Sequence, residues 1–193
     1  MTIGILGGSF NPVHIGHTML ASYLQQFAGL DEVWLTLSPL NPLKANPEEL
    51  IPDVQRLRML ERAIGNTKGL NICDIELAMP RPSYTINTLR YLAKRYPRHT
   101  FKLIIGSDNW KIFDQWKDAE SILSDFGVII YPRPGYPLGT IYDDGVDVVS
   151  APTADVSSSF IRKALAKGKD MNYFLPQGVY SYILDNNLYG AKR

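Results

Sequence analysis

The chain has 193 residues, of which 45% are hydrophobic, and its 20 basic and 19 acidic side chains leave a formal net charge of +1. This length predicts one domain, spanning residues 1–193, with a sizeable core. The balanced charge gives no electrostatic footprint for nucleic acid or for an anionic membrane surface. The single cysteine, Cys73, excludes an intramolecular disulfide and favours a reducing, cytoplasmic compartment. We also expect no signal peptide and no membrane span, because no run of about 18 apolar residues occurs.

Apolar runs that alternate with amphipathic segments predict strands and helices in turn. In chain order, the predicted strands are Ile3–Leu6, Glu32–Leu37, Leu70–Ile75, Phe101–Ile105, Gly127–Tyr131 and Val146–Val149. The predicted helices are His17–Phe27, Asp53–Ile64, a segment capped by Ser83 or Thr85 that runs to Arg95, Ser157–Ala166 and Gln177–Asn187. Strands that are apolar throughout and alternate with helices predict an α/β fold, with a parallel sheet and helices on both of its faces.

The polar segments of the chain fall into two groups. The helix predicted over Asp53–Ile64 is amphipathic, and its polar positions carry Arg56, Arg58, Glu61 and Arg62. The other distinctive segments each follow a predicted strand directly. Because ligands of parallel sheets bind at the carboxyl ends of the strands, near a switch point in strand order, we expect these segments to converge in space.

The most informative segment joins the first predicted strand to the first predicted helix. Its glycines allow the backbone to approach an anion closely, and the start of the helix offers unpaired N–H groups and the positive end of a dipole. Two histidines three residues apart add imidazoles, which can carry charge near neutral pH. This arrangement predicts phosphate binding by the segment Gly7-Gly8-Ser9-Phe10-Asn11-Pro12-Val13-His14-Ile15-Gly16-His17.

A second candidate for phosphate binding begins a helix near the end of the chain, in the segment Val156-Ser157-Ser158-Ser159-Phe160-Ile161-Arg162. Its serines supply hydroxyls and backbone N–H groups, and Arg162 can direct a planar fork of donors at phosphate oxygens. Taken alone, the serines could simply cap the helix. The segment Gly106-Ser107-Asp108, which follows the predicted strand Phe101–Ile105, could likewise be an Asx turn.

The chain has no Walker A pattern and no GxGxxG, which disfavours a P-loop kinase and a dinucleotide-binding dehydrogenase.

Together the two motifs resemble the signatures of the nucleotidyltransferase superfamily. The first has the GGSFNPxHxGH form of the (T/H)xGH signature, and the second resembles the ISSTxIR motif, with Val156 and Ser159 as substitutions. In this form the chain resembles the bacterial nicotinate mononucleotide adenylyltransferases over nearly its whole length. The resemblance implies a Rossmann-like nucleotidyltransferase fold. It also implies that ATP adenylylates nicotinate mononucleotide to deamido-NAD and pyrophosphate, a step of NAD biosynthesis, with Mg²⁺ accompanying the ATP.

The resemblance also implies roles for the residues that match the family's motifs. His14 and His17 would bind phosphates, with His17 near the α-phosphate. Trp116 would stack on the pyridine ring, a task that suits an indole in a polar loop, and backbone N–H groups near Tyr84 and Thr85 would face the pyridine carboxylate. The other ATP-binding residues that the resemblance implies are Gly8, Ser9, Phe10, Gly106, Asp108, Ser158, Ser159 and Arg162. The other mononucleotide-binding residues that it implies are Asn11, Lys44 and Arg133. It implies no protein ligand for a metal.

One segment departs from the family's pattern. Where members often carry Pro-Pro-His-Lys after the second strand, this chain has Pro42-Leu43-Lys44 and lacks the histidine. Lys44 could still reach a phosphate from this loop, but the departure puts its role in doubt.

The expected chemistry requires little of the side chains beyond positioning. The phosphate of a mononucleotide is already an anion, so its attack on ATP needs no strong general base, and catalysis rests on positioning and on neutralising charge.

Three alternative functions stay open at this point. They are the same reaction on nicotinamide mononucleotide, another small nucleotidyltransferase such as a pantetheine-phosphate adenylyltransferase, and a nucleotide-binding regulator without turnover. The segments of Trp116 and Arg133 argue against the second, and the intact His14, His17 and Arg162 argue against the third. The oligomeric state stays open as well.

Overall fold

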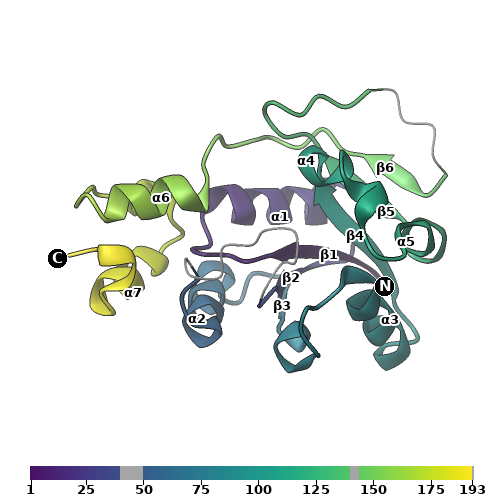
Figure 1. Ribbon diagram of the computed structural model, residues 1–193, viewed down its shortest axis with the longest axis horizontal. Helices are drawn as coiled ribbons and strands as arrows, with labels where there is room; N and C mark the ends of the chain where they lie inside the picture. The colour runs from purple at the N-terminus through teal and green to yellow at the C-terminus, as the bar shows by residue number, and fades with distance from the viewer. Residues whose placement is uncertain (40–49, 140–143, 193) are drawn as a thin grey trace.

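The structure, a computed structural model, describes residues 1–39, 50–139 and 144–192. In these ranges, six parallel strands form one open sheet in the order β3-β2-β1-β4-β5-β6 (Figure 1). The strands are β1 (Thr2–Gly8), β2 (Glu32–Leu37), β3 (Leu70–Cys73), β4 (Thr100–Gly106), β5 (Val128–Tyr131) and β6 (Val146–Val148). The strand order runs outward in opposite directions from β1 and β4, so the switch point lies between the carboxyl ends of these two neighbours. The predicted parallel sheet is confirmed.

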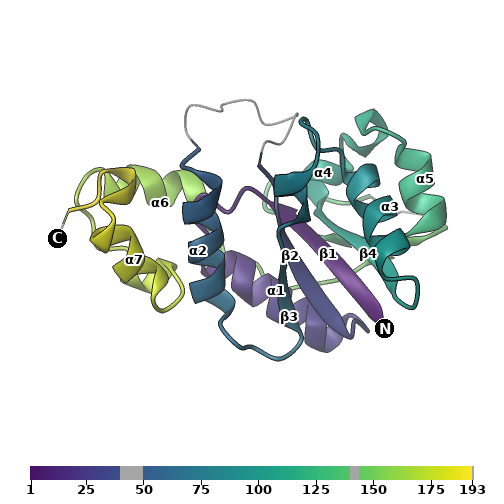
Figure 2. The same cartoon turned by 90° about the horizontal axis from the view of Figure 1, so that it is seen from below.

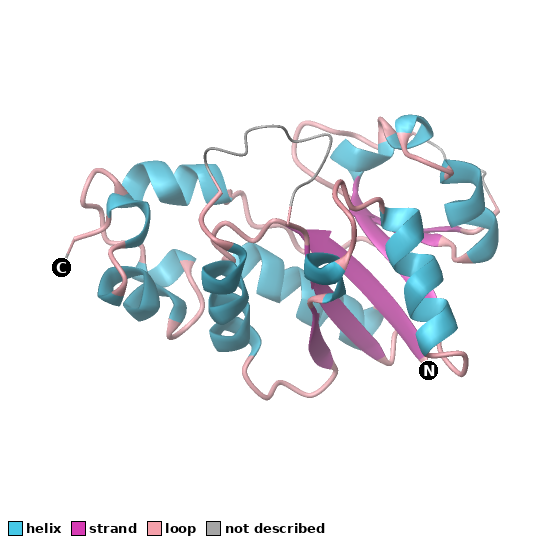
Figure 3. Cartoon of the chain, turned by 60° about the horizontal axis from the view of Figure 1, so that its bottom comes forward, coloured by secondary structure: helices cyan, strands magenta, loops and turns pink. Residues whose placement is uncertain are grey.

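Helices cover both faces of this sheet, with α1 on one face and α3 on the other (Figures 1 and 3). The α-helices are α1 (Ile15–Phe27), α2 (Asp53–Ile64), α3 (Thr85–Arg95), α4 (Ser107–Trp110), α5 (Ala119–Asp125), α6 (Ser158–Leu165) and α7 (Val179–Asp185). Short 3₁₀ helices are η2 (Ile75–Ala78), η3 (Phe113–Gln115), η4 (Asn172–Phe174) and η5 (Leu188–Gly190). Alternate side chains of β1 pack into two apolar clusters: Leu6 joins the cluster that contains α1 and α2, whereas Ile3 and Ile5 join the cluster that contains α3 and α5.

The C-terminal helices α6 and α7 lie beyond α2, at the end of the molecule opposite α5 (Figure 2). The chain reaches them by running back across the molecule after β6 (Figure 1). This return places the start of α6 beside the segment that joins β1 to α1, where the Ser158 hydroxyl donates to the Pro12 carbonyl at 2.9 Å. The two motifs at opposite ends of the sequence are therefore neighbours in space.

Several boundaries differ from the sequence prediction by one or two residues, and three of the differences have a clear physical reason. The strand predicted over Leu70–Ile75 ends at Cys73, because the chain turns into η2 at Ile75. Neither Ser83 nor Thr85 caps α3: the N-cap is Tyr84, which makes no side-chain cap, and the Ser83 hydroxyl donates instead to Glu76. The helix predicted from Gln177 begins only at Val179, because Gly178 has a φ of 83°, outside the helical region.

The guanidinium of Arg56, on α2, is completely buried, although the helical pattern placed this residue among polar positions. Its Nη1 donates to the carbonyls of Ser9 at 2.6 Å and of Ser38 at 2.8 Å, and its Nε donates to the carbonyl of Ile51 at 3.2 Å. Its Nη2 forms an ion pair with Asp53. A buried charge is stable only when it is paired and hydrogen-bonded, and Arg56 meets this condition by joining the turn after β1 to the end of β2.

We predict that Arg56→Met destabilises the fold by about 3 kcal/mol or more, because it leaves Asp53 without its buried partner and the carbonyls of Ser9, Ser38, Pro39 and Ile51 without this donor. The measurement is urea unfolding followed by circular dichroism. Arg58→Met is the matched control on the same helix: Arg58 is exposed, pairs with the exposed Glu61, and should leave the midpoint nearly unchanged. Equal midpoints for Arg56→Met and the wild type would contradict the prediction.

Candidate active site

Two adjoining cavities open at the switch point of the sheet. The smaller has a volume of about 320 Å³ and the larger a volume of about 770 Å³. Gly7 and Gly8, which end β1, and Ser9, which follows them, form a segment that we call the glycine turn; it lines both cavities, as do Asn109 and Tyr131. The glycine turn therefore forms a wall that two ligands in the two cavities would share.

The larger cavity collects most of the residues that the sequence associates with phosphate. They are Gly8, Ser9, Phe10, Asn11, His14, His17, Asp108, Arg133, Ser158, Ser159 and Arg162. Gly106 lines the smaller cavity, and Lys44 lies outside the described residues. Arg133 and Asn11, expected near the mononucleotide, are thus on the same side as the residues expected to hold ATP.

The glycine turn is shaped by the aromatic ring that follows it. Phe10 has a φ of 44°, and its ring meets the His17 ring edge-on, with 5.0 Å between centroids. A Cβ added to Gly8 would lie 2.9 Å from the Phe10 ring, so a side chain at this position would displace the ring. The close packing keeps the backbone of the turn exposed to both cavities.

The two histidines of the motif lie face to face at the start of α1, with 3.7 Å between ring centroids. The backbone N–H of His14 donates to Nδ1 of His17 at 3.2 Å. An Nδ1 that accepts a hydrogen bond places the proton of a neutral imidazole on Nε2. The backbone therefore orients His17 as an Nε2–H donor.

His14 is only 6% exposed, and its pKa is lowered to about 4. Burial is the larger cause, and the positive charge of Arg133 is the second. The sequence suggested that both imidazoles could carry charge near neutral pH, but His14 is neutral there in the structure. It can donate a hydrogen bond to a phosphate without bringing a charge of its own.

The second motif, at the start of α6, is hydrogen-bonded to the first motif. Arg162 donates from Nη1 to the carbonyl of Asn11 at 2.9 Å and from Nη2 to the Ser159 hydroxyl at 3.4 Å. The Ser157 hydroxyl caps the helix by accepting from the N–H of Phe160 at 3.2 Å. Capping, left open by the sequence, is thus the role of Ser157, whereas Ser159 and Arg162 line the larger cavity.

The C-terminal segment also reaches the site, which the sequence did not indicate. The hydroxyl of Tyr189, in η5, donates to Oδ1 of Asn11 at 2.8 Å. Burial raises the pKa of this hydroxyl, so it remains a proton donor. Tyr189 thus fixes the orientation of the Asn11 side chain, with Oδ1 directed at η5.

Asp108 and Arg133 form an ion pair at the rim of the larger cavity, with 3.7 Å between Oδ2 and Nε. The other carboxylate oxygen of Asp108 is buried and has no hydrogen-bond partner among the described residues. Such an oxygen is suited to accept from a hydroxyl of a bound ligand. The segment Gly106–Asp108 is not an Asx turn, because Ser107 and Asp108 begin the short helix α4.

The smaller cavity brings together the residues expected to hold a flat ring. Tyr84 and Thr85 line it from the start of α3, and Trp116 lines it from the end of η3. Trp116 is half-buried rather than exposed, with its ring 5.5 Å from that of Phe113 between centroids. Its Nε1 is buried and has no partner in the described part of the chain.

Several lining residues of the smaller cavity belong to no motif that the sequence singled out, and Glu76, Lys117 and Thr36 are among them. Glu76 is buried, and its two carboxylate oxygens accept from the hydroxyls of Ser83 and Thr88, each at 2.9 Å. The motif residue Ser83 donates to Glu76, and the motif residue Trp116 directly precedes Lys117. These two motif residues were therefore the signals from which Glu76 and Lys117 could have been inferred.

Two features are absent from residues 1–39, 50–139 and 144–192. Within these ranges, no helix has the length and apolar character needed to cross a bilayer. The same ranges contain no group of three or more His, Cys, Asp or Glu side chains placed to hold a metal ion.

The lowered pKa of His14 predicts that acid weakens the fold. In the unfolded chain His14 takes up a proton near pH 6.5, whereas in the folded chain it does so only near pH 4. The contribution of His14 to the free energy of unfolding is therefore complete above pH 6.5, and it is lost as the pH falls from 6.5 to 4. A difference of this size corresponds to about 3 kcal/mol. Urea unfolding at several pH values should show this loss, and His14→Gln should reduce the slope. An NMR titration of the His14 ring with a midpoint near 6.5 would contradict the prediction.

Comparison with known proteins identifies the family. The cytidylyltransferase-like family model matches residues 5–164. A "Probable nicotinate-nucleotide adenylyltransferase" of Bacteroides fragilis is 48% identical over 182 residues, covering 94% of this chain and 90% of that protein. A protein described in the same words from Azobacteroides pseudotrichonymphae is 46% identical over 189 residues, covering 96% of this chain and 98% of that protein. Plasmodium falciparum nicotinic acid mononucleotide adenylyltransferase, solved with NaAD, has the same fold, with a TM-score of 0.79 at 22% identity over 98% of this chain and 97% of that one. These matches confirm the predicted family and fold: the chain belongs to the cytidylyltransferase-like family and, within it, to the nicotinate-nucleotide adenylyltransferases.

Proposed function

We propose that this chain transfers the adenylyl group of ATP to nicotinate mononucleotide, which yields deamido-NAD and pyrophosphate. The observation that carries this proposal is the pair of cavities that share the glycine turn of β1. One cavity holds the donors suited to a triphosphate, and the other holds an indole and the start of a long helix, suited to a flat, anionic ring. The names of the relatives point to the same substrate.

The chemistry is a single displacement at phosphorus. An oxygen of the mononucleotide 5′-phosphate forms a bond to the α-phosphorus of ATP, the bond from that phosphorus to its bridging oxygen breaks, and pyrophosphate leaves in line. No proton has to move, so the side chains act by positioning the two substrates and by stabilising charge. In this proposal the attacking phosphate and the α-phosphate meet at Gly8 and Ser9, which line both cavities.

The side chains of the larger cavity divide between hydrogen bonds and charge. The Nε2–H of His17 donates to the α-phosphate, and His14 adds a neutral donor beside it. Ser159 and Arg162 bind the β- and γ-phosphates, with Arg162 as a planar fork of donors. The unpaired oxygen of Asp108 accepts from a ribose hydroxyl on the adenosine side.

Mg²⁺ accompanies ATP in this proposal. This ion prefers oxygen ligands and retains several waters, so the triphosphate oxygens and water are its ligands, and it neutralises part of the phosphate charge. We place the reaction in the cytoplasm, since the one cysteine of the chain, Cys73, is a buried thiol and not part of a disulfide.

A pyrophosphate-release assay tests the proposed function directly. The protein is given ATP and Mg²⁺ with nicotinate mononucleotide, nicotinamide mononucleotide or phosphopantetheine in separate reactions. We expect release with nicotinate mononucleotide at a kcat/KM at least about 10²-fold above that for the amide, since donors arranged for an anion are left unpaired by an amide. Release with phosphopantetheine alone would reassign the substrate, and no release with any of them would point to a regulator.

We predict that His17→Ala lowers kcat by about 10²–10³-fold, the scale of losing one preorganised donor to the transition state, while KM changes much less. Steady-state kinetics with both substrates measures the effect. Thr18→Ala is the matched control, because Thr18 lies next along α1, its hydroxyl donates to the Ile15 carbonyl of the same helix, and it lines neither cavity. A folded His17→Ala variant with wild-type kcat would remove His17 from the proposed mechanism.

A further inference from the structure

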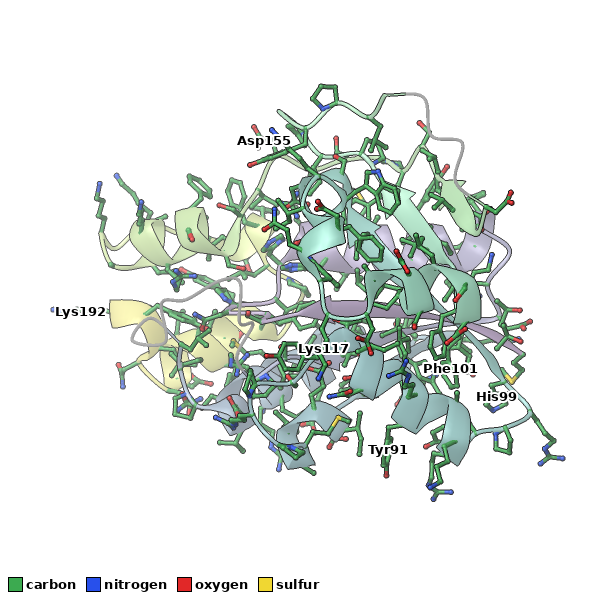
Figure 4. The ribbon with its side chains drawn as sticks, turned by 45° about the vertical axis from the view of Figure 1, so that its right-hand side comes forward. Tyr91, His99, Phe101, Lys117, Asp155 and Lys192 are labelled. Carbon is green, nitrogen blue, oxygen red and sulfur yellow. The ribbon has the colours of Figure 1, made fainter. Side chains whose placement is uncertain are left out.

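Lys117 is a cation at the edge of the cavity proposed for the pyridine ring. It lies between η3 and α5 and lines the smaller cavity together with its neighbour Trp116 (Figure 4). Its ammonium lies 4.7 Å from the centroid of the Tyr84 ring. Lys117 therefore lies beside Tyr84, the N-cap residue of α3. This is the end of the helix at which backbone N–H groups attract an anion.

The described lining of this cavity contains two charged side chains, Lys117 and Glu76. Glu76 is buried, and both of its oxygens accept hydrogen bonds from hydroxyls, so its negative charge is fixed in the wall. A ring carboxylate that enters the cavity meets this negative charge. The partial positive charge at the start of α3 offsets part of this repulsion. Among the described lining residues, the ammonium of Lys117 carries the full positive charge that can offset the rest.

We propose that Lys117 determines the preference for the acid over the amide form of the mononucleotide, by placing its ammonium beside the ring carboxylate at the start of α3. This inference rests on the proposed function, and it names the specificity determinant of the same site. The neutral amide gains little from a cation at this position, so Lys117 favours one substrate without improving catalysis in general. Trp116 cannot make this distinction, because stacking does not depend on the charge of the ring substituent.

The test compares kcat/KM for nicotinate and nicotinamide mononucleotide at saturating ATP. Lys117→Met retains the length and the apolar stem of the side chain but removes its charge. We expect kcat/KM for the acid to fall about tenfold, mainly through KM, and kcat/KM for the amide to stay close to the wild-type value. The N–H groups of α3 remain in the variant, so part of the acid preference persists.

Two further variants separate charge from structure. Lys117→Arg keeps the charge and should retain most of the wild-type ratio. Lys111→Met is the matched control, because Lys111 is exposed and lines neither of the two cavities, so its loss should leave both substrates unaffected. Unchanged activity of Lys117→Met on the amide also shows that the variant is folded.

The possible outcomes are distinguishable. If the wild type prefers the acid and Lys117→Met keeps the same ratio, the inference about Lys117 is overturned and the proposed function stands. If the wild type uses both mononucleotides equally, the proposed substrate and the inference both fall. A ratio that drops in Lys117→Met and recovers in Lys117→Arg supports the inference.

Discussion

The buried guanidinium of Arg56 is the constraint on which the geometry of the site depends. It holds the carbonyls of Ser9 and Ser38 within hydrogen-bond distance of one nitrogen, and so it ties the turn after β1 to the end of β2. A buried charge tolerates little displacement of its partners, because each lost hydrogen bond leaves an uncompensated polar group. The turn held in this way is the wall common to both cavities. In the proposed reaction, the position at which the two substrates meet would therefore depend on a residue that lines neither cavity.

The other side of the same turn is held from the C-terminal part of the chain. Arg162 binds the carbonyl of Asn11, and the hydroxyl of Tyr189 binds its side-chain amide. Segments about 150 and 180 residues away along the chain thus restrain the residue that follows the glycine turn. Restraining a loop before the ligands bind lowers the entropy lost when the reacting groups are aligned. This explains why the chain returns across the sheet after β6 and packs α6 beside the β1–α1 segment (Figure 1).

The sequence predicted the parallel sheet, the helices on both faces and the convergence of the two end motifs, because hydrophobic periodicity and glycine turns are local signals. It did not predict the burial of Arg56, since the pattern of α2 is that of an amphipathic helix whose arginines face solvent. It did not indicate that Arg133 forms an ion pair with Asp108 in the larger cavity. Tyr189 carried no signal at all. These three residues depend on contacts between distant segments, which no local pattern encodes.

The difference in charge between arginine and histidine in the larger cavity suits the proposed reaction. A guanidinium is always charged in proteins, so the arginines of the larger cavity would supply charge to phosphates without acting as acids. A histidine that carried charge there would offer a proton to the attacking phosphate, and protonation would make that phosphate a weaker nucleophile. Burial, and secondly the charge of Arg133, keep His14 neutral before a phosphate binds, so the imidazole meets an arriving phosphate as a hydrogen-bond donor. In the proposed reaction Arg133 would thus both attract phosphate and lower the tendency of the imidazole beside it to carry a proton.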